Sequence, residues 1–164
     1  MPQTYPPLLS GFPPVMSADT QLLILGSFPG TASLAAGQYY AHPRNQFWPL
    51  LSAVLNEDLP SLPYDLRLER LISHHIGLWD VIAACERKGS LDASIRRAQA
   101  ANFSVLQQGH AALRRIAFNG KTAGRYAPLF ASAGFDTLVL PSSSPANAQL
   151  SFEQKLVQWR FLRG

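Results

Sequence analysis

The chain has 164 residues, of which 47% are hydrophobic, so it is long and apolar enough to form one domain with a core of its own. Its formal net charge of +4 is a modest excess that permits a polyanionic partner without requiring one. The single cysteine excludes an intrachain disulfide framework, and no Cys/His spacing resembles a zinc site. No apolar stretch could span a bilayer and no signal peptide is recognisable, so we expect a cytoplasmic protein without metal or cofactor.

The first half of the chain begins with a proline-rich segment, residues 1–20, which we expect to be an extended arm packed on the domain. Residues 21–26 form a continuous apolar run, typical of a strand that is covered on both faces. A dense turn signal follows at 26–30, and we expect a long loop over 31–44. Apolar residues then recur at helical spacing from Asn45 or Gln46 onward, with Pro49 tolerated in the first turn.

The second half alternates in the same way. We predict strands over 76–83, 115–118 and 137–140, and helices over 64–73, 103–109, 122–133 and 151–162, with a short helical turn near Ile95. Four strand–loop–helix units predict a three-layer α/β/α fold with a short four-stranded parallel sheet, in one domain over 1–164. Ligands of such sheets bind beyond the carboxyl ends of the strands, so the loops there are the candidates for chemistry.

The loop over 26–30 has the sequence Gly-Ser-Phe-Pro-Gly, which fits a tight turn against a ligand and matches neither a P-loop nor a dinucleotide fingerprint. The stretch over 39–48 is richer, because it combines four aromatic residues with His42, Arg44 and Asn45. Rings and amides of this kind suit an everted nucleobase, which is stacked on its faces and read at its edge. Two other roles remain open, core packing for Phe47 and a helix N-cap for Asn45.

Two further strand ends carry polar groups. Asn119-Gly120-Lys121 ends the third predicted strand, and Lys121 either contacts a phosphate or is a solvated surface lysine. After the fourth strand come three serines between prolines, which suit phosphate contacts but also suit a polar connector. Asp80 ends the second strand, yet no second carboxylate accompanies it for a sugar-hydrolase pair.

Together these loops resemble the mismatch-specific uracil/thymine-DNA glycosylases, which carry Gly-Ile-Asn-Pro-Gly followed by an Asn-x-Phe-Trp segment at a similar distance. The resemblance covers about residues 21–150 and implies the uracil-DNA glycosylase fold. The first loop departs from the pattern: we align Ser27 with the catalytic Asn, and a serine cannot orient water with a carboxamide oxygen. The hypoxanthine-DNA glycosylase branch is more similar, with Gly-Ser-Phe-Pro-Gly, Tyr-Tyr-x-His-Pro-x-Asn-x-Phe-Trp and a Ser-Pro-Ala-Asn loop.

The resemblance implies a monofunctional, hydrolytic DNA glycosylase that removes a deaminated base, above all hypoxanthine, from double-stranded DNA, and that acts as a monomer. It makes Asn45 the catalytic residue, which would orient the attacking water. The expected base pocket consists of Gly26, Ser27, Phe28, Tyr40, His42, Phe47 and Asn119. The expected DNA contacts are Arg44, Lys121, Ser142, Ser143, Ser144, Pro145 and Asn147.

Three alternatives remain open. A mismatch-specific uracil glycosylase would share the fold and the chemistry and differ in the shape of the pocket. A nucleotide- or DNA-binding module without catalysis would keep the basic residues and the serine loop. A small-molecule hydrolase with a serine nucleophile is a third class, although no Gly-x-Ser-x-Gly elbow is present.

Overall fold

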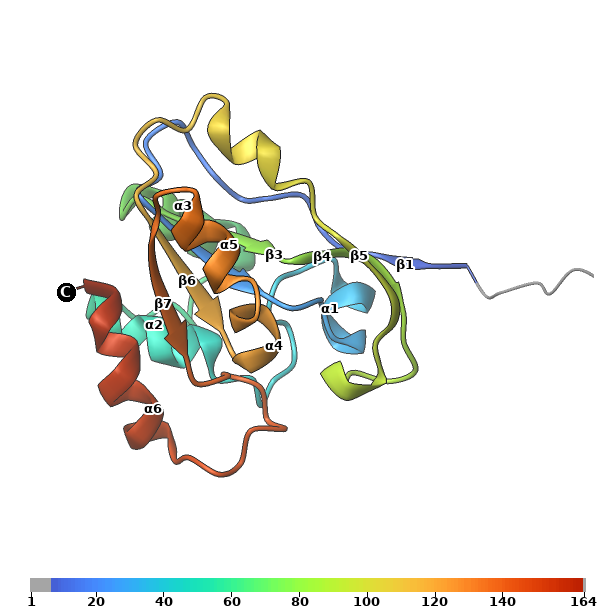
Figure 1. Ribbon diagram of the computed structural model, residues 1–164. Coiled ribbons are helices and arrows are strands. Elements are labelled where there is room, and N and C mark those ends of the chain that lie inside the picture. Colours follow the sequence, from blue (N-terminus) through green and yellow to red (C-terminus); the bar gives the residue numbers. More distant parts are fainter. Residues whose placement is uncertain (1–6, 164) are drawn as a thin grey trace, which may run out of the picture.

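A four-stranded parallel sheet forms the centre of the protein in a computed structural model that describes residues 7–163 (Figure 1). The strand order is β3-β2-β6-β7, and the strands are β2 (Leu22–Gly26), β3 (Ile76–Asp80), β6 (Arg115–Asn119) and β7 (Asp136–Leu140). The register pairs Gly26 with Asp80 and Asn119 with Leu140, so the four strands end along one edge. This arrangement confirms the predicted fold class.

Both faces of the sheet are buried, as the continuous apolar run of β2 predicts. Ile24 packs into the core on one face, whereas Leu23 and Leu25 pack into the core on the other. Successive side chains of a strand point to opposite faces, so an apolar run without alternation requires cover on both sides.

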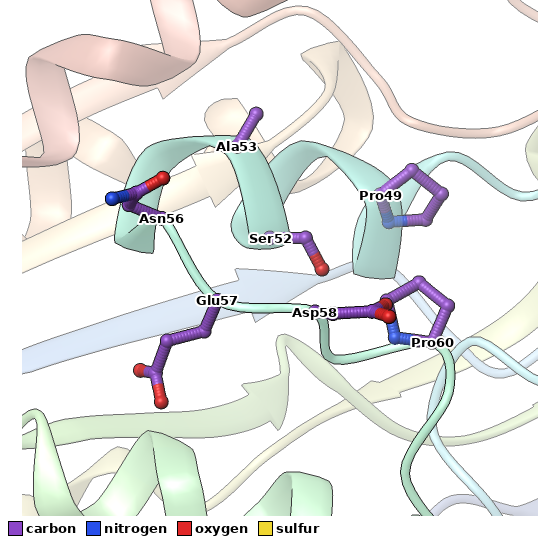
Figure 2. Close-up of a pocket in the computed structure, with 7 residues that line it drawn as sticks. All are labelled: Pro49, Ser52, Ala53, Asn56, Glu57, Asp58 and Pro60. Atoms are coloured by element: carbon purple, nitrogen blue, oxygen red, sulfur yellow. The ribbon is translucent and has the colours of Figure 1, made fainter.

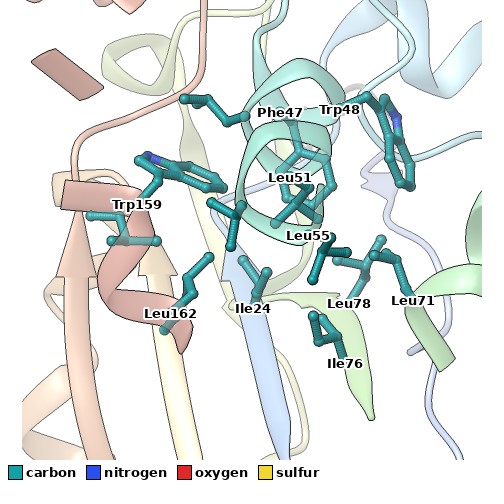
Figure 3. Packing of buried hydrophobic residues seen from close by; sticks show 14 of the residues in the cluster. Ile24, Phe47, Trp48, Leu51, Leu55, Leu71, Ile76, Leu78, Trp159 and Leu162 are labelled. Atoms are coloured by element: carbon teal, nitrogen blue, oxygen red, sulfur yellow. The ribbon is translucent and has the colours of Figure 1, made fainter. Parts of the chain in front are cut away.

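Three helices cover the first face: α2 (Phe47–Leu55), α3 (Tyr64–Ser73) and α6 (Phe152–Trp159), which continues into the 3-10 turn η3 (Arg160–Arg163). Figure 3 shows Phe47, Leu51 and Leu55 of α2 among Trp159 and Leu162 from the C-terminal segment and Leu78 from the sheet. α6 begins with a capping box, in which Ser151 and Gln154 exchange side-chain and backbone hydrogen bonds. These contacts fix α2, and with it the loop that precedes it.

The second face carries α1 (Thr31–Ala36), α4 (Lys121–Gly124), α5 (Ala127–Ser132) and the 3-10 turn η2 (Phe103–Gln107). The helix predicted over 122–133 is therefore two short helices. Pro128 lies in the first turn of α5, and because it lacks an N–H it cannot continue a helical ladder from α4.

The strand predicted over 76–83 is also two strands. The chain leaves the parallel sheet at Val81, whose N–H donates to the Gly26 carbonyl over 2.8 Å. It then enters a separate antiparallel sheet of β1 (Leu9–Ser10), β4 (Ile82–Glu86) and β5 (Arg96–Ala100). β5 is exposed along its whole length, so it carries no apolar alternation, and only the turn η1 (Asp92–Ser94) was predicted nearby.

Two more segments near the N-terminus position the site. The predicted loop over 31–44 contains helix α1, which ends at Gly37 in the left-handed conformation. The N-terminal arm lies on the domain, with Val15 bridging Leu78, and the approach is so close that a Cβ on Gly77 would lie 2.7 Å from the Val15 carbonyl. The part of the expected arm before residue 7 lies outside the described residues. Within 7–163, no helix has the length and apolar character that crossing a membrane requires.

Candidate active site

Three side chains from different loops meet at the carboxyl edge of the sheet: Asn45, Asn119 and Ser143. The Asn45 Oδ1 atom accepts from the Ser143 hydroxyl over 2.8 Å and from the Phe47 N–H over 3.0 Å. Asn119 donates from Nδ2 to the Ser143 Oγ over 2.9 Å, and its Oδ1 accepts from the Ser143 N–H over 2.9 Å. A hydrogen-bonded chain therefore links β6, the loop after β7 and the start of α2.

This chain of bonds settles where the Asn45 carboxamide sits. The N-cap of α2 is Gln46, which makes no side-chain cap bond, so the structure does not place Asn45 at the N-cap. Asn45 lies one residue earlier, and its Oδ1 accepts from the N–H of Phe47, the first residue of α2, while Ser143 holds the same oxygen at the strand ends. Asn45 itself is partly exposed, whereas Ser143 and Asn119 are buried behind it.

A buried lysine braces the same loop from behind. Lys155 of α6 is only 2% exposed, and its Nζ donates to the Gln46 Oε1 over 2.9 Å. The Gln46 N–H in turn donates to the Ser143 carbonyl over 3.0 Å. Burial lowers the pKa of the Lys155 amine. Sequence reasoning missed this lysine, because its place in α6 resembles that of a solvated surface residue.

Tyr40 lies flat on Phe47, with ring centroids 3.8 Å apart and an angle of 15° between the planes. Phe47 is fully buried, so the prediction that it lines the base pocket directly is wrong: it supports Tyr40, which is partly exposed. Tyr40 has a positive φ of 57°, a left-handed conformation that a bulky residue adopts only under constraint. Trp48 is a core residue.

Gly26 forms the floor between Tyr40 and Asp80. A Cβ on Gly26 would lie 2.6 Å from the Asp80 Oδ1 and 2.8 Å from the Tyr40 hydroxyl, so only glycine permits both groups to approach. Burial, and to a lesser extent the charge of Asp92, raises the pKa of Asp80 to about 7. Sequence reasoning dismissed Asp80 for want of a second carboxylate, although an acid at the end of an apolar strand is itself a signal.

The first loop contributes less directly than predicted. The Ser27 hydroxyl donates to the Asp92 Oδ1 over 2.7 Å, and the Phe28 ring is buried beneath the guanidinium of Arg87. Arg87 also donates to the Pro29 carbonyl over 2.7 Å, which holds the loop in place. Counted back from the proline, the residue in the place of the Asn of Gly-Ile-Asn-Pro-Gly is Phe28 and not Ser27, which corrects the alignment. Neither side chain supplies a carboxamide.

His42 closes a tight turn before Asn45. Its Nδ1 atom accepts from the Arg44 N–H over 3.0 Å, and its carbonyl accepts from the Asn45 N–H over 2.9 Å. Arg44 is exposed beside this turn, and Lys121 is exposed at the start of α4. Both are therefore placed where a phosphate could reach them, and their contact with DNA stays a prediction.

The serine loop after β7, residues 141–147, is held by hydrogen bonds within the loop. Ser142 and Ser144 accept through their hydroxyls from the N–H groups of Ser144 and Ala146, and Asn147 donates to the Ser142 carbonyl. Ser143 is 1% exposed, so the prediction that it contacts DNA is wrong, because its side chain points inward to Asn45 and Asn119. Pro145 is exposed on the loop and remains a predicted DNA contact.

A surface hollow of about 520 Å³ lies elsewhere, beside α2 and the turn that follows it (Figure 2). Its lining contains none of the residues that the sequence singled out. Glu57 is the one acid in its lining with a shifted pKa. The hydrogen bond with His74 is the main cause that lowers this pKa, and Glu57 also forms an ion pair with Arg70. The hollow therefore adds nothing to the site at the strand ends. Among the residues that the structure describes, no group of three or more acids, histidines or cysteines is arranged to hold a metal.

The fold agrees with the family comparison. The model of the Uracil DNA glycosylase superfamily matches residues 13–163, so the chain belongs to this superfamily. The match spans all four strands of the parallel sheet and each of the loops that form the site.

Within the superfamily, the chain is similar to several individual proteins. The chain is 46% identical over 137 residues to a protein of Methanosarcina barkeri named hypoxanthine DNA glycosylase, a match that covers 84% of this chain and 87% of the relative. A protein of Methanosarcina acetivorans with the same name is 44% identical over 141 residues, covering 86% of this chain and 89% of the relative. An NMR structure from Methanosarcina acetivorans, provisionally assigned as a uracil DNA glycosylase, superposes with a TM-score of 0.84 at 40% identity and covers 96% of this chain and 99% of that one.

Proposed function

We propose that this protein is a DNA glycosylase that hydrolyses the N-glycosidic bond of an everted hypoxanthine, with Asn45 as the residue that orients the attacking water. The observation that carries the proposal is the partly exposed Asn45 carboxamide, held at the carboxyl edge of the sheet by Ser143 and the Phe47 N–H. Membership of the superfamily and the two relatives named hypoxanthine DNA glycosylase support the choice of reaction and of base.

Eversion is the first step of the proposed reaction. Taking a base out of the stack costs a few kcal/mol, and less for a mispaired base, so a deaminated base is extruded more readily than a paired one. Tyr40, held flat on the Phe47 ring, would border the everted base with its hydroxyl edge toward it.

Cleavage then requires water near the anomeric carbon. As the bond from C1′ to the base breaks, its electron pair leaves with the base, the water oxygen bonds to C1′, and the proton that water loses neutralises the departing base. A carboxamide is too weak a base to remove that proton early, so Asn45 contributes by positioning the water.

The hydrogen bonds of Asn45 specify how this positioning works. Its Oδ1 already accepts two hydrogen bonds, which uses both of its lone pairs. A water molecule that donates to Oδ1 therefore takes the place of the Ser143 hydroxyl, which can turn away because its oxygen is also held by Asn119. Ser143 thus aligns the carboxamide in the free enzyme, and in the complex with DNA the water replaces the Ser143 hydroxyl as the donor to Asn45 Oδ1.

DNA binding surrounds this site. Arg44 and Lys121 are exposed close to Asn45 and Asn119 in the chain and would neutralise backbone phosphates, while the exposed Pro145 on the serine loop would occupy the space left in the stack. Ser142, Ser144 and Asn147 keep the loop rigid through bonds within it. We expect the protein to act as a monomer, in the cytoplasm, on double-stranded DNA.

A panel of single-turnover base-release reactions tests the proposal. The substrates are duplexes that contain inosine, uracil or xanthine opposite each normal base, with thymine opposite guanine and an undamaged adenine duplex as controls. We expect free hypoxanthine to be released fastest and the abasic strand to break only after alkali. Release of uracil alone would replace the proposed substrate, and the absence of release from every duplex would refute glycosylase activity.

A further inference from the structure

Two buried oxygen atoms at the site have no partner at hydrogen-bond distance: the Oδ2 of Asp80 and the hydroxyl of Tyr40. Asn119 is near enough to influence the Tyr40 hydroxyl, but its carboxamide is already bonded to Ser143. Asp80 is 5% exposed, and its other carboxyl oxygen, Oδ1, and the Tyr40 hydroxyl both border Gly26. A buried polar atom without a partner destabilises the fold, so two such groups around Gly26, at the edge where ligands of parallel sheets bind, indicate groups that a ligand completes.

The surroundings of Asp80 favour its neutral form. Within residues 7–163, no lysine, arginine or histidine forms an ion pair with it. The titratable groups that face it are themselves acidic: Tyr39 and Tyr40 from the segment after α1, and Asp92 from η1. A carboxyl group that burial keeps protonated gains an O–H donor, which a carboxylate lacks.

We propose that Asp80, as a neutral carboxylic acid, and Tyr40 together donate hydrogen bonds to the exocyclic oxygen of the departing base. This inference rests on the proposed function and names the feature of the base that the site selects. Asp80 reaches the site from the end of β3 and Tyr40 from the loop before α2, and both border Gly26.

The chemistry of the leaving group explains why two neutral donors are needed. The electron pair that hypoxanthine takes from the broken bond spreads onto its 6-oxygen, and two O–H donors stabilise the charge where it develops. A carboxylate at position 80 would repel that charge. Adenine carries an amino group at the same position, whose lone pair is delocalised and cannot accept, so the pair of donors selects the deaminated base over its parent.

Two measurements on the full-length protein test the inference. The first is the single-turnover rate on an inosine duplex between pH 5.5 and pH 8.5. The second is the ratio of that rate to the rate on a deoxynebularine duplex, whose purine lacks the 6-oxygen. The variants are Asp80→Asn, Asp80→Ala and Tyr40→Phe, with Asp65→Asn, an exposed acid on α3, as the matched control.

For the parent protein we expect the inosine rate to fall as the pH rises above about 7, because the acid loses its donor proton. Asp80→Asn keeps a neutral N–H donor and should lose this decline, whereas Asp65→Asn should keep it. Asp80→Ala should slow inosine cleavage about 100-fold and Tyr40→Phe about tenfold, while both leave deoxynebularine cleavage within about threefold of the parent. The preference for inosine would then collapse in both variants.

Other results would overturn the inference and leave the proposed function standing. If the parent releases hypoxanthine but Asp80→Asn keeps the same decline with pH, Asp80 does not act through its proton. If the substitutions at residues 80 and 40 slow both substrates equally, the groups only shape the site. A parent protein that releases no base from any duplex refutes the proposed function and this inference together. Urea denaturation of each variant shows whether a lost rate reflects lost folding.

Discussion

The Asp80→Asn variant should gain stability relative to the parent protein as the pH rises. The structure raises the pKa of this carboxyl from its ordinary value of 3.8 to about 7, chiefly through burial. Because the folded-state pKa lies above the unfolded-state pKa, the parent loses stability as the pH rises from about 4 to about 7, and the loss is complete above 7. At 1.36 kcal/mol per pKa unit, the full loss is about 4 kcal/mol.

The asparagine variant lacks this loss. The contributions of all other titrating groups to the pH dependence are the same in both proteins and cancel in the difference. The free energy of unfolding of the variant minus that of the parent should therefore increase by about 3 kcal/mol between pH 5 and pH 8. Equilibrium urea denaturation of both proteins at the two pH values measures the difference, provided that the denaturant slopes agree. A difference between variant and parent that stays constant across this range would refute the account of Asp80 as a buried, unpaired acid.

Three further predictions concern the neighbours of Asp80 and Asn45. Gly26→Ala places a Cβ against Asp80 and Tyr40 and should cost about 1–3 kcal/mol in the free energy of unfolding; parental stability would show that the floor of the site is not tightly packed. Ser143→Ala removes the hydroxyl that joins Asn45 to Asn119 and should lower the base-release rate about tenfold, or about 1.4 kcal/mol, whereas Ser73→Ala, at an exposed serine of α3, should retain the parental rate; equal rates would remove Ser143 from the alignment of Asn45. Lys155→Met replaces a buried amine by an apolar chain of similar length and should change stability by less than about 1.5 kcal/mol, whereas Lys155→Ala should cost about 2 kcal/mol or more; a severe loss in the methionine variant would show that the bond to Gln46 is essential to the fold.

The parallel sheet was predictable because its signal is local and strong. β2, β6 and β7 are each followed by glycine, serine or proline residues, and the apolar run of β2 requires cover on both faces. The split at Val81 was not predictable in the same way, since the apolar character continues from β3 into β4 while the chain changes sheet. An apolar run predicts that a segment is buried, but it does not predict which sheet the segment joins.

The sequence placed the candidate residues in the loops at the strand ends, and the structure shows which of them contact one another there. Asn45 and Asn119 do meet at the strand ends, but the sequence could not show that Ser143 lies between them instead of facing DNA. Serine suits a buried bridge and a surface contact equally well, and only the path of the loop decides between them. Asp80 was set aside for a related reason, because its burial without a charged partner comes from the fold around it and is not visible in the sequence.

The most direct test of the central claim is the single-turnover release of hypoxanthine by Asn45→Ala. The matched control is Asn102→Ala, since Asn102 accepts from a backbone N–H two residues ahead as Asn45 does, but caps the remote turn η2. If Asn45 positions the attacking water, its removal should slow release about 100-fold or more, roughly 3 kcal/mol, while the Asn102 variant retains the parental rate. Release by Asn45→Ala at the parental rate would contradict the assignment of Asn45 as the catalytic residue.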